Sequence, residues 1–204
     1  MNTTALGLLL ASCAALLVLE RLGIRTTLAL TFKGDVKRET RFLAQYGQSV
    51  CTVLAVALVW ALDPRAEGGR VVVAIAGAVF WASVASFLLK RLFGRIRPGR
   101  ENAGAFLGPS WKHANYRESF PSSHSACAVA LTTVLALAYP PAAVIFWALA
   151  LCCGGLRYIL DAHWPSDVLA GISLGYVMGW IAWATVWQYK WFDWLAVPLW
   201  NIGR

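Results

Sequence analysis

Six long apolar runs divide this 204-residue chain, and short polar connections separate them. The clearest run lies between Arg70 and Lys90, where 19 consecutive residues carry no charge. A helix needs about 17–25 mostly apolar residues to cross a bilayer, whose interior offers no partner for an open backbone. The pattern therefore predicts an all-α polytopic membrane protein with about six transmembrane helices.

Charged, proline and glycine residues set the limits of these runs. The Pro140-Pro141 pair separates the fourth run from the fifth, because proline interrupts the hydrogen bonds of a helix. The predicted spans are residues 5–23, 48–62, 71–89, 125–139, 142–160 and 168–187. Since no repeat or second domain interrupts them, we expect residues 1–204 to form a single membrane-embedded domain.

Composition agrees with a membrane location. Hydrophobic residues make up 59% of the chain and charged residues 14%, whereas soluble domains are about half apolar and a quarter charged. Residues 24–47, before the second span, are basic and mixed in polarity, which predicts an interfacial helix. Indole rings gather at membrane–water interfaces, so the C-terminal tryptophans predict an interfacial belt. These are Trp187, Trp191, Trp194 and Trp200.

The net charge of +8 excludes neither nucleic acid nor anionic lipid by itself. The cations, however, are confined to short breaks between apolar runs, so we expect membrane lipids and a phosphorylated lipid substrate as partners, and no nucleic acid. The five cysteines all lie inside apolar runs without metal-ligand spacing. The sequence therefore predicts no disulfide, no metal site and no cofactor.

Polar segments at the ends of the predicted spans carry the candidate chemistry. Residues 90–98 contain Lys90, Arg97 and Pro98 in a basic cluster, which on its own is typical of a membrane boundary. Residues 121–124 place Ser122, Ser123 and His124 before an apolar run. On its own this is a capped helix start, but helix N-termini also offer unpaired N–H groups and a positive dipole end to an anion.

A third polar segment, residues 157–167, contains Arg157, His163 and Asp167. The four-residue spacing around a proline allows the Asp167 carboxylate to orient the His163 imidazole. With six spans, all three segments lie on the same side of the membrane. Together they supply cations to neutralise phosphate oxygens, a nucleophile and a proton donor, which phosphoryl transfer without a metal requires.

In their order and spacing these residues resemble the type-2 phosphatidic acid phosphatase family of membrane lipid phosphatases, which shares its site with vanadium haloperoxidases. The motifs that carry the resemblance are Lys90-x6-Arg97-Pro98, Pro121-Ser122-Ser123-His124 and Arg157-x5-His163-x3-Asp167. The family usually has glycine at the position of Ser123 and serine at that of Leu156. Neither departure removes a group that performs chemistry, so we expect both to affect substrate preference.

The resemblance implies a role for each matching residue. His163 is the expected nucleophile, forming a phosphohistidine, and Asp167 orients it. His124 is the expected general acid for the leaving group and later the base that activates water, so the rate is expected to be bell-shaped in pH. The expected phosphate cradle consists of Lys90, Arg97, Ser122, Ser123 and Arg157.

The substrate remains open among phosphatidate, phosphatidylglycerol phosphate, polyprenyl diphosphate and lipid A phosphate. Alternative functions are a haloperoxidase or acid phosphatase that uses the same site on soluble substrates, and a non-catalytic transporter or scaffold. A transporter would place charges within its spans, whereas predicted spans three to six hold almost none between their ends.

The resemblance implies a bacterial inner-membrane protein whose site faces outward, towards the periplasm. The positive-inside rule points the other way, because 14 of the 18 Lys and Arg residues lie on the side of the site.

Overall fold

The computed structural model describes residues 1–28, 30, 33–63 and 67–189, and most of these are helical; the longest stretch outside the α-helices is residues 94–122. The all-α fold class is thereby confirmed. Seven α-helices are present: α1 (Thr3–Arg21), α2 (Gly34–Ala44), α3 (Ser49–Leu62), α4 (Gly68–Phe93), α5 (Ser123–Ala138), α6 (Ala143–Ile159) and α7 (Pro165–Gln188). Three short 3₁₀ turns join them: η1 (Gln45–Gly47), η2 (Asn115–Arg117) and η3 (Pro140–Ala142).

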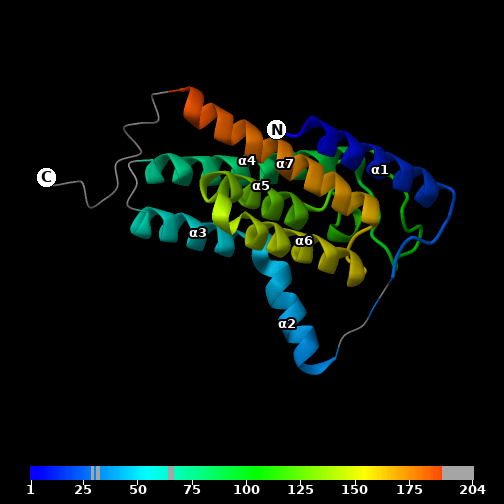
Figure 1. The fold of residues 1–204 in the computed structure, drawn as a ribbon. Helices are drawn as coiled ribbons and strands as arrows, with labels where there is room; N and C mark the ends of the chain where they lie inside the picture. Colours follow the sequence, from blue (N-terminus) through cyan, green and yellow to red (C-terminus); the bar gives the residue numbers. More distant parts are fainter. Residues whose placement is uncertain (29, 31–32, 64–66, 190–204) are drawn as a thin grey trace, which may run out of the picture.

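Helix α5 forms the centre of the bundle. It packs against α4, α6 and α7, while α1 lies outside on α7 and α3 lies outside on α4. Most residues of α5 are buried, from Ser125 through Leu135. Figure 1 shows these helices running along one common direction, with α2 projecting away from the bundle. The site-bearing start of α5 is thus enclosed by neighbouring helices.

The sequence predicts six membrane spans. The described residues contain four helices that could cross a membrane, or five if a bent pair of helices counts as one span. Helices α1, α4 and α7 and the unit Pro140–Ile159 are long and apolar enough to cross a membrane. Segments Arg38–Gly47 and Ser49–Leu62 also qualify as one span with a 65° bend. Helix α5 has 16 residues, and at 1.5 Å per residue it is about 24 Å long, less than a hydrocarbon core of about 30 Å.

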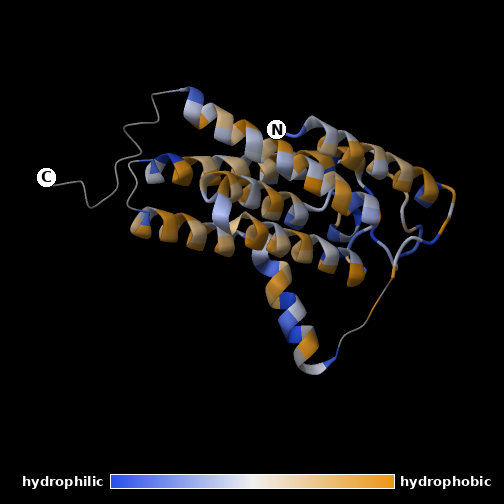
Figure 2. Ribbon diagram, viewed as in Figure 1, coloured by the Kyte–Doolittle hydropathy of each residue, from blue (hydrophilic) through white to orange (hydrophobic). Residues whose placement is uncertain are grey.

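The burial of α5 provides the physical reason for its length. Because neighbouring helices surround it, its ends are set by contacts with protein rather than by the thickness of the lipid. The predicted run 125–139 is therefore a helix, but its apolar character reflects burial inside the bundle. Figure 2 shows the bundle helices as largely hydrophobic and the hydrophilic residues gathered mainly towards one end of the bundle and on α2.

A helix is present before the second span as α2, which carries both polar and apolar residues (Figure 2). Its interfacial position stays a prediction, since its residues from Arg38 onward also qualify as part of the bent span. The predicted tryptophan belt begins at Trp187, whose ring stacks on Trp183 with centroids 3.8 Å apart. Trp191, Trp194 and Trp200 lie outside the described residues.

Close packing of α7 on α5 depends on three glycines four residues apart, Gly171, Gly175 and Gly179. A Cβ at Gly175 would lie 2.2 Å from the carbonyl oxygen of Ala126 on α5. Small residues at this spacing allow membrane helices to approach one another at backbone distance. The contact also fixes the start of α7 beside the start of α5, where a backbone hydrogen bond joins Ser122 to Asp167.

We predict that Gly175→Ala destabilises the protein by about 1–3 kcal/mol, because the added methyl group overpacks the α5–α7 contact. Gly7→Ala is the matched control, since nothing lies within 4 Å of a Cβ at that helical position. Thermal unfolding in detergent measures both variants. Equal melting temperatures for Gly175→Ala and the wild type would contradict the packing described here.

Candidate active site

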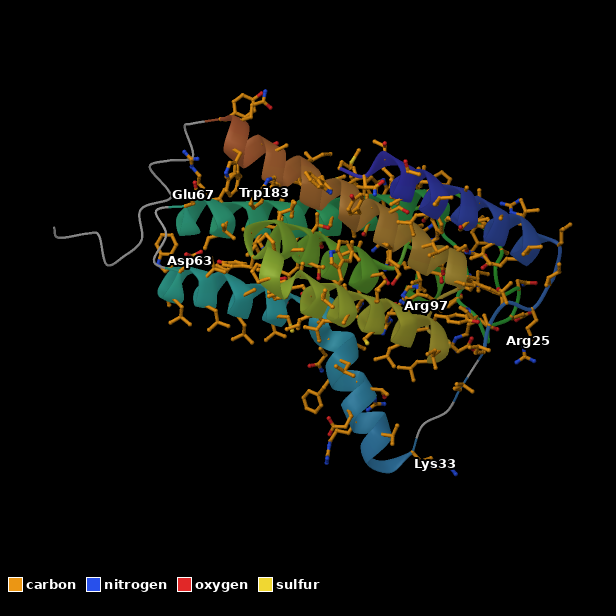
Figure 3. All side chains as sticks on the ribbon, viewed as in Figure 1. Arg25, Lys33, Asp63, Glu67, Arg97 and Trp183 are labelled. Carbon is orange, nitrogen blue, oxygen red and sulfur yellow. The ribbon has the colours of Figure 1, made fainter. Side chains whose placement is uncertain are left out.

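The predicted site residues converge at one end of the bundle. The last turns of α4 and α6 meet the first turns of α5 and α7 there, together with the connection after α4. Figure 3 shows Arg97 at this end, with Asp63 and Glu67 at the opposite end. The sequence motifs, up to 77 residues apart from Lys90 to Asp167, are therefore brought together in space.

His163 is buried and has a defined orientation, with 1% of its side chain exposed. Its Nδ1 atom lies 2.8 Å from the carbonyl oxygen of Ser119. Because a carbonyl oxygen only accepts, Nδ1 carries the proton in this contact, and the neutral ring has its lone pair on Nε2. The structure therefore selects the tautomer in which the lone pair on Nε2 is available.

Burial lowers the pKa of His163 to about 4, although the neighbouring Asp167 acts to raise it. Positive charges on Arg157 and Arg97 lower it further. The imidazole is consequently neutral near pH 7, which is the state that a nucleophile requires.

Asp167 supports this arrangement through both carboxylate oxygens. Its Oδ2 accepts hydrogen bonds from the Ser119 hydroxyl at 2.5 Å and from the Trp164 backbone N–H at 2.9 Å. The same oxygen lies 3.7 Å from Nδ1 of His163. Asp167 thus contacts the imidazole as predicted, and it also fixes Ser119, whose carbonyl makes the closer contact.

The second carboxylate oxygen of Asp167 accepts a 2.6 Å hydrogen bond from Arg95. Arg95 is almost completely buried and also bonds Glu20 of α1 at 2.7 Å. The hydroxyl of Ser166 joins the same cluster by accepting from Arg95 and donating to Glu20. One buried cation therefore holds two carboxylates, and it ties α1 to the start of α7.

The three predicted phosphate-binding cations behave differently from Arg95. Lys90, Arg97 and Arg157 are half-buried, yet none makes an ion pair or a side-chain hydrogen bond with another described residue. The Nε atoms of Arg97 and Arg157 are buried without a partner in that part of the chain; those of Arg91 and Arg95 are as well, but these two arginines bond carboxylates through their other nitrogens. Buried polar groups are normally satisfied, so unpaired guanidinium groups indicate a place for an anion.

His124 lies in the first turn of α5 and faces these groups. It interacts electrostatically with Arg157, His163, Lys90 and Arg97. The two serines predicted to bind phosphate through backbone amides differ in structure. The N–H of Ser122 already donates a hydrogen bond to the Asp167 carbonyl at 2.9 Å. The N–H groups of the following residues, Ser123 onward, begin the helix and lack intrahelical acceptors. They are the backbone donors best placed for an anion.

Among the residues that the structure describes, no group of three or more His, Cys, Asp and Glu side chains could hold a metal ion.

Sequence comparison identifies the family to which the chain with this site belongs. Residues 68–191, which contain all three motifs, match the family model described as the PAP2 superfamily. The chain belongs to the PAP2 superfamily. This confirms the resemblance inferred from the ordered motifs.

Individual relatives of this PAP2 protein differ in their substrates. It is 33% identical to the decaprenylphosphoryl-5-phosphoribose phosphatase of Mycobacterium tuberculosis, over 74% of this chain and 81% of that protein. It is 39% identical to the lipid A 1-phosphatase of Rhizobium etli, over 54% of this chain. That match spans only 47% of the Rhizobium etli protein, about half its length.

Two solved structures share the fold. The crystal structure of Aquifex aeolicus LpxE aligns with a TM-score of 0.61 at 21% identity, covering 79% of this chain and 91% of that one. The transmembrane PAP2-type phosphatidylglycerolphosphate phosphatase of Bacillus subtilis aligns with a TM-score of 0.54 at 16% identity, covering 88% of each chain. At these identities the likeness concerns the arrangement of helices.

The sequence reasoning did not find Glu20, Arg95 and Ser119. Glu20 is a single carboxylate at the end of an apolar run, and Arg95 lies between two motif cations, so both resemble ordinary boundary charges. Ser119 acts partly through its backbone carbonyl, which no side-chain pattern reveals. The one available signal was a carboxylate in the last turn of the first span, which needs a partner once it is buried.

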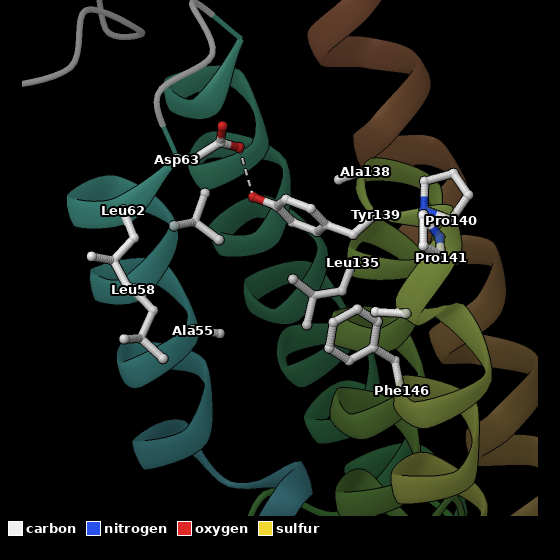
Figure 4. Close-up of a pocket in the computed structure, with 12 residues that line it drawn as sticks. Ala55, Leu58, Leu62, Asp63, Leu135, Ala138, Tyr139, Pro140, Pro141 and Phe146 are labelled. Atoms are coloured by element: carbon white, nitrogen blue, oxygen red, sulfur yellow. Dashed lines mark hydrogen bonds between the residues drawn. The ribbon is translucent and has the colours of Figure 1, made fainter.

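The large apolar cavity of about 840 Å³ lies away from this site. It is lined by the ends of α3 and α5, η3 and the start of α6 (Figure 4). Tyr139 donates a 2.7 Å hydrogen bond to Asp63 at its edge. Its position at the opposite end of the bundle from Arg97 separates it from the phosphate-binding cations (Figure 3).

We predict that Arg95→Met lowers the free energy of unfolding by about 3–5 kcal/mol, because it leaves two buried carboxylates without their cation. Arg21→Met is the control. Arg21 stacks on the same Phe106 ring as Arg95, but it is exposed, so its loss is expected to cost about 1 kcal/mol or less. Denaturant unfolding in detergent compares them, and equal costs would contradict the structural role of the buried cluster.

The lowered pKa of His163 predicts acid sensitivity. The unfolded state binds this proton near pH 6.5 and the folded state only near pH 4, so the unfolded state holds more protons between these values. Stability should therefore fall as pH drops through this window, by about 3 kcal/mol in total. Unfolding of the wild type and His163→Asn at a series of pH values measures the difference. Parallel curves for the two proteins would rule out this titration.

Proposed function

We propose that this PAP2 protein is a lipid phosphate phosphatase that works through a phosphohistidine on His163. The observation that carries the proposal is the contrast among its cations. Arg95 is paired with two carboxylates through its terminal nitrogens, while Lys90, Arg97 and Arg157 have no carboxylate partner among the described residues. Three unpaired cations beside a neutral, oriented imidazole suit a phosphate dianion and its attack by nitrogen.

In the first half-reaction Nε2 of His163 attacks phosphorus, and the bond from phosphorus to the leaving oxygen breaks. His124 gives a proton to that oxygen, so that an alcohol departs rather than an alkoxide, or a phosphate departs with one negative charge fewer. The proton on Nδ1 of His163 remains bonded to the Ser119 carbonyl, and the nearby Asp167 carboxylate stabilises the positive charge of the phosphorylated ring.

In the second half-reaction His124 acts as a base. It takes a proton from water, whose oxygen attacks phosphorus and displaces Nε2 of His163. Inorganic phosphate leaves, and both imidazoles return to their starting states. Lys90, Arg97 and Arg157 neutralise the phosphoryl oxygens throughout, together with the first-turn amides at Ser123. Because side chains and amides supply all of this charge, we propose that the reaction needs no metal ion.

The substrate class is the lipid phosphates. The functions of the relatives support this, since they act on lipid A, on a decaprenyl-linked sugar phosphate and on phosphatidylglycerolphosphate. The membrane character of four or five helices supports a site close to lipid headgroups. The Ser123 and Leu156 positions, which differ from the usual family residues, are where we expect preference among these lipids to be set.

The topology proposed with this function has six passes, α1, the α2–α3 unit, α4, α5, α6 and α7. Helix α5 crosses as the enclosed central helix despite its length. We place the site on the outer, periplasmic face of a bacterial inner membrane, as the family resemblance implies. The excess of Lys and Arg on the same side is accounted for only in part by phosphate binding.

Phosphate release from a panel of lipid phosphates by purified protein tests the function. The panel holds phosphatidate, phosphatidylglycerol phosphate, a polyprenyl diphosphate and lipid A, beside a water-soluble phosphate ester, each with and without chelator. We expect at least one lipid to be hydrolysed in chelator, and His163→Ala to lose activity by about 10³-fold or more, as expected for a lost nucleophile.

His113→Ala is the matched control, because His113 bonds the Gly108 carbonyl and has no assigned role in the reaction. Its activity is expected to remain close to that of the wild type. Full activity in His163→Ala would overturn the proposed mechanism, and hydrolysis of the soluble ester alone would overturn the substrate class.

A further inference from the structure

We propose that Gln48 is a positioning residue for His124, anchoring one ring nitrogen so that the other transfers the proton. This inference rests on the proposed function, in which His124 is the acid and base. The Gln48 side-chain amide lies 3.3 Å from Nε2 of His124, between the start of α3 and the start of α5. Gln48 lies outside the three motifs and was not found from the sequence.

The corner of chain that carries Gln48 is fitted closely to the first turn of α5. A Cβ at the neighbouring Gly47 would lie 2.0 Å from the carbonyl oxygen of His124, so only glycine permits this approach. On the other side of the corner, the Tyr46 hydroxyl bonds Thr132 of α5 at 3.0 Å. The thiol of Cys153 on α6 lies 3.4 Å from the Ala44 carbonyl and 4.0 Å from that of His124.

These contacts join residues that are far apart in the sequence, and they hold the corner at residues 44–48 from both sides. The position of Gln48 is therefore determined by packing at Gly47 and Tyr46 as well as by its own hydrogen bond. This fits a side chain whose task is to hold a ring in place, because its backbone cannot drift away from His124 without breaking the packing.

In each of the two histidines, one ring nitrogen is then anchored by a hydrogen bond and the other is available for the reaction. His163 has Nδ1 anchored by a carbonyl oxygen, which leaves Nε2 for attack on phosphorus. His124 has Nε2 anchored by Gln48, and its Nδ1 has no hydrogen bond to any described residue. Nδ1 is accordingly the atom that gives the proton to the leaving oxygen and later takes one from water.

An amide suits this position because it both donates and accepts hydrogen bonds. Its NH₂ group can donate to a bare Nε2, which is the contact in the structure. After rotation by 180° its carbonyl accepts from Nε2–H, so the anchor persists when His124 is protonated and after Nδ1 has lost its proton. A carboxylate at this position could only accept, and would favour the charged ring.

The other groups that act on His124 are all positive or neutral. Arg157 reaches it from α6, Lys90 from α4, Arg97 from the connection after α4 and His163 from the connection before α7. A negative charge introduced at Gln48 would therefore be the first anionic side chain beside this ring, apart from bound substrate. Its effect on the alkaline limb of the pH–rate profile should be readily visible.

The experiment compares Gln48→Glu and Gln48→Met with the wild type on the best lipid substrate of the panel. For Gln48→Glu we expect the alkaline limb of the pH–rate profile to move upward by about one pH unit, because the carboxylate stabilises protonated His124. For Gln48→Met we expect kcat to fall roughly three- to ten-fold with little change in KM, as for a lost hydrogen bond.

Leaving-group dependence separates proton transfer from general damage to the site. A nitrophenyl phosphate has a leaving group that needs little protonation, so Gln48→Met should lose less activity on it than on a lipid alcohol ester. Gln45→Glu is the matched control, since it places the same charge in the same η1 corner, and no hydrogen bond of the described residues joins the Gln45 side chain to His124. Its pH–rate profile should match that of the wild type.

An unshifted alkaline limb in Gln48→Glu, with Gln48→Met as active as the wild type on both substrates, would overturn the role of Gln48. Equal shifts in Gln48→Glu and Gln45→Glu would overturn it as well, because they would reflect general charge. Either result would leave the proposed function standing, provided that His163→Ala is inactive. Activity retained in His163→Ala would instead overturn the proposed function itself.

Discussion

The buried guanidinium of Arg95 is the interaction on which the site depends. It joins Glu20 at the end of α1 to Asp167 in the first turn of α7. Asp167 in turn holds Ser119, and the Ser119 carbonyl sets the tautomer of His163. A charge enclosed in protein within a membrane is costly unless its partners are complete, so this cluster forms only when the helices are assembled correctly.

Two classes of cation therefore lie within a few residues of one another. Arg95 is satisfied by protein carboxylates and has a structural role. Arg97, two residues later, and Arg157 have no carboxylate partner among the described residues. The Gly94 turn ends α4 with a left-handed backbone, φ 57°, and begins the connection from which both Arg95 and Arg97 extend. One short segment thus supplies both the buried, paired arginine and an arginine of the proposed phosphate cradle.

Much of this arrangement could be predicted from the sequence. The apolar runs gave the helices within a few residues, and the ordered residues His124, His163 and Asp167 gave the family. The prediction was incomplete at α5, because an apolar run has the same appearance whether protein or lipid surrounds it. It was also incomplete at Ser122, whose N–H bonds the carbonyl of Asp167 rather than remaining open for phosphate.

The sequence by itself determined the membrane class, the helical content and the chemical groups available, because these follow from composition, run length and residue type. Only the tertiary structure decided which arginine is paired, which nitrogen of His163 is free, and that Gln48 lies beside His124. These outcomes depend on contacts between residues far apart in the sequence, such as Glu20 and Ser166, which are 146 positions apart. Local sequence patterns do not predict contacts between residues so far apart, because these contacts are determined by how the helices pack.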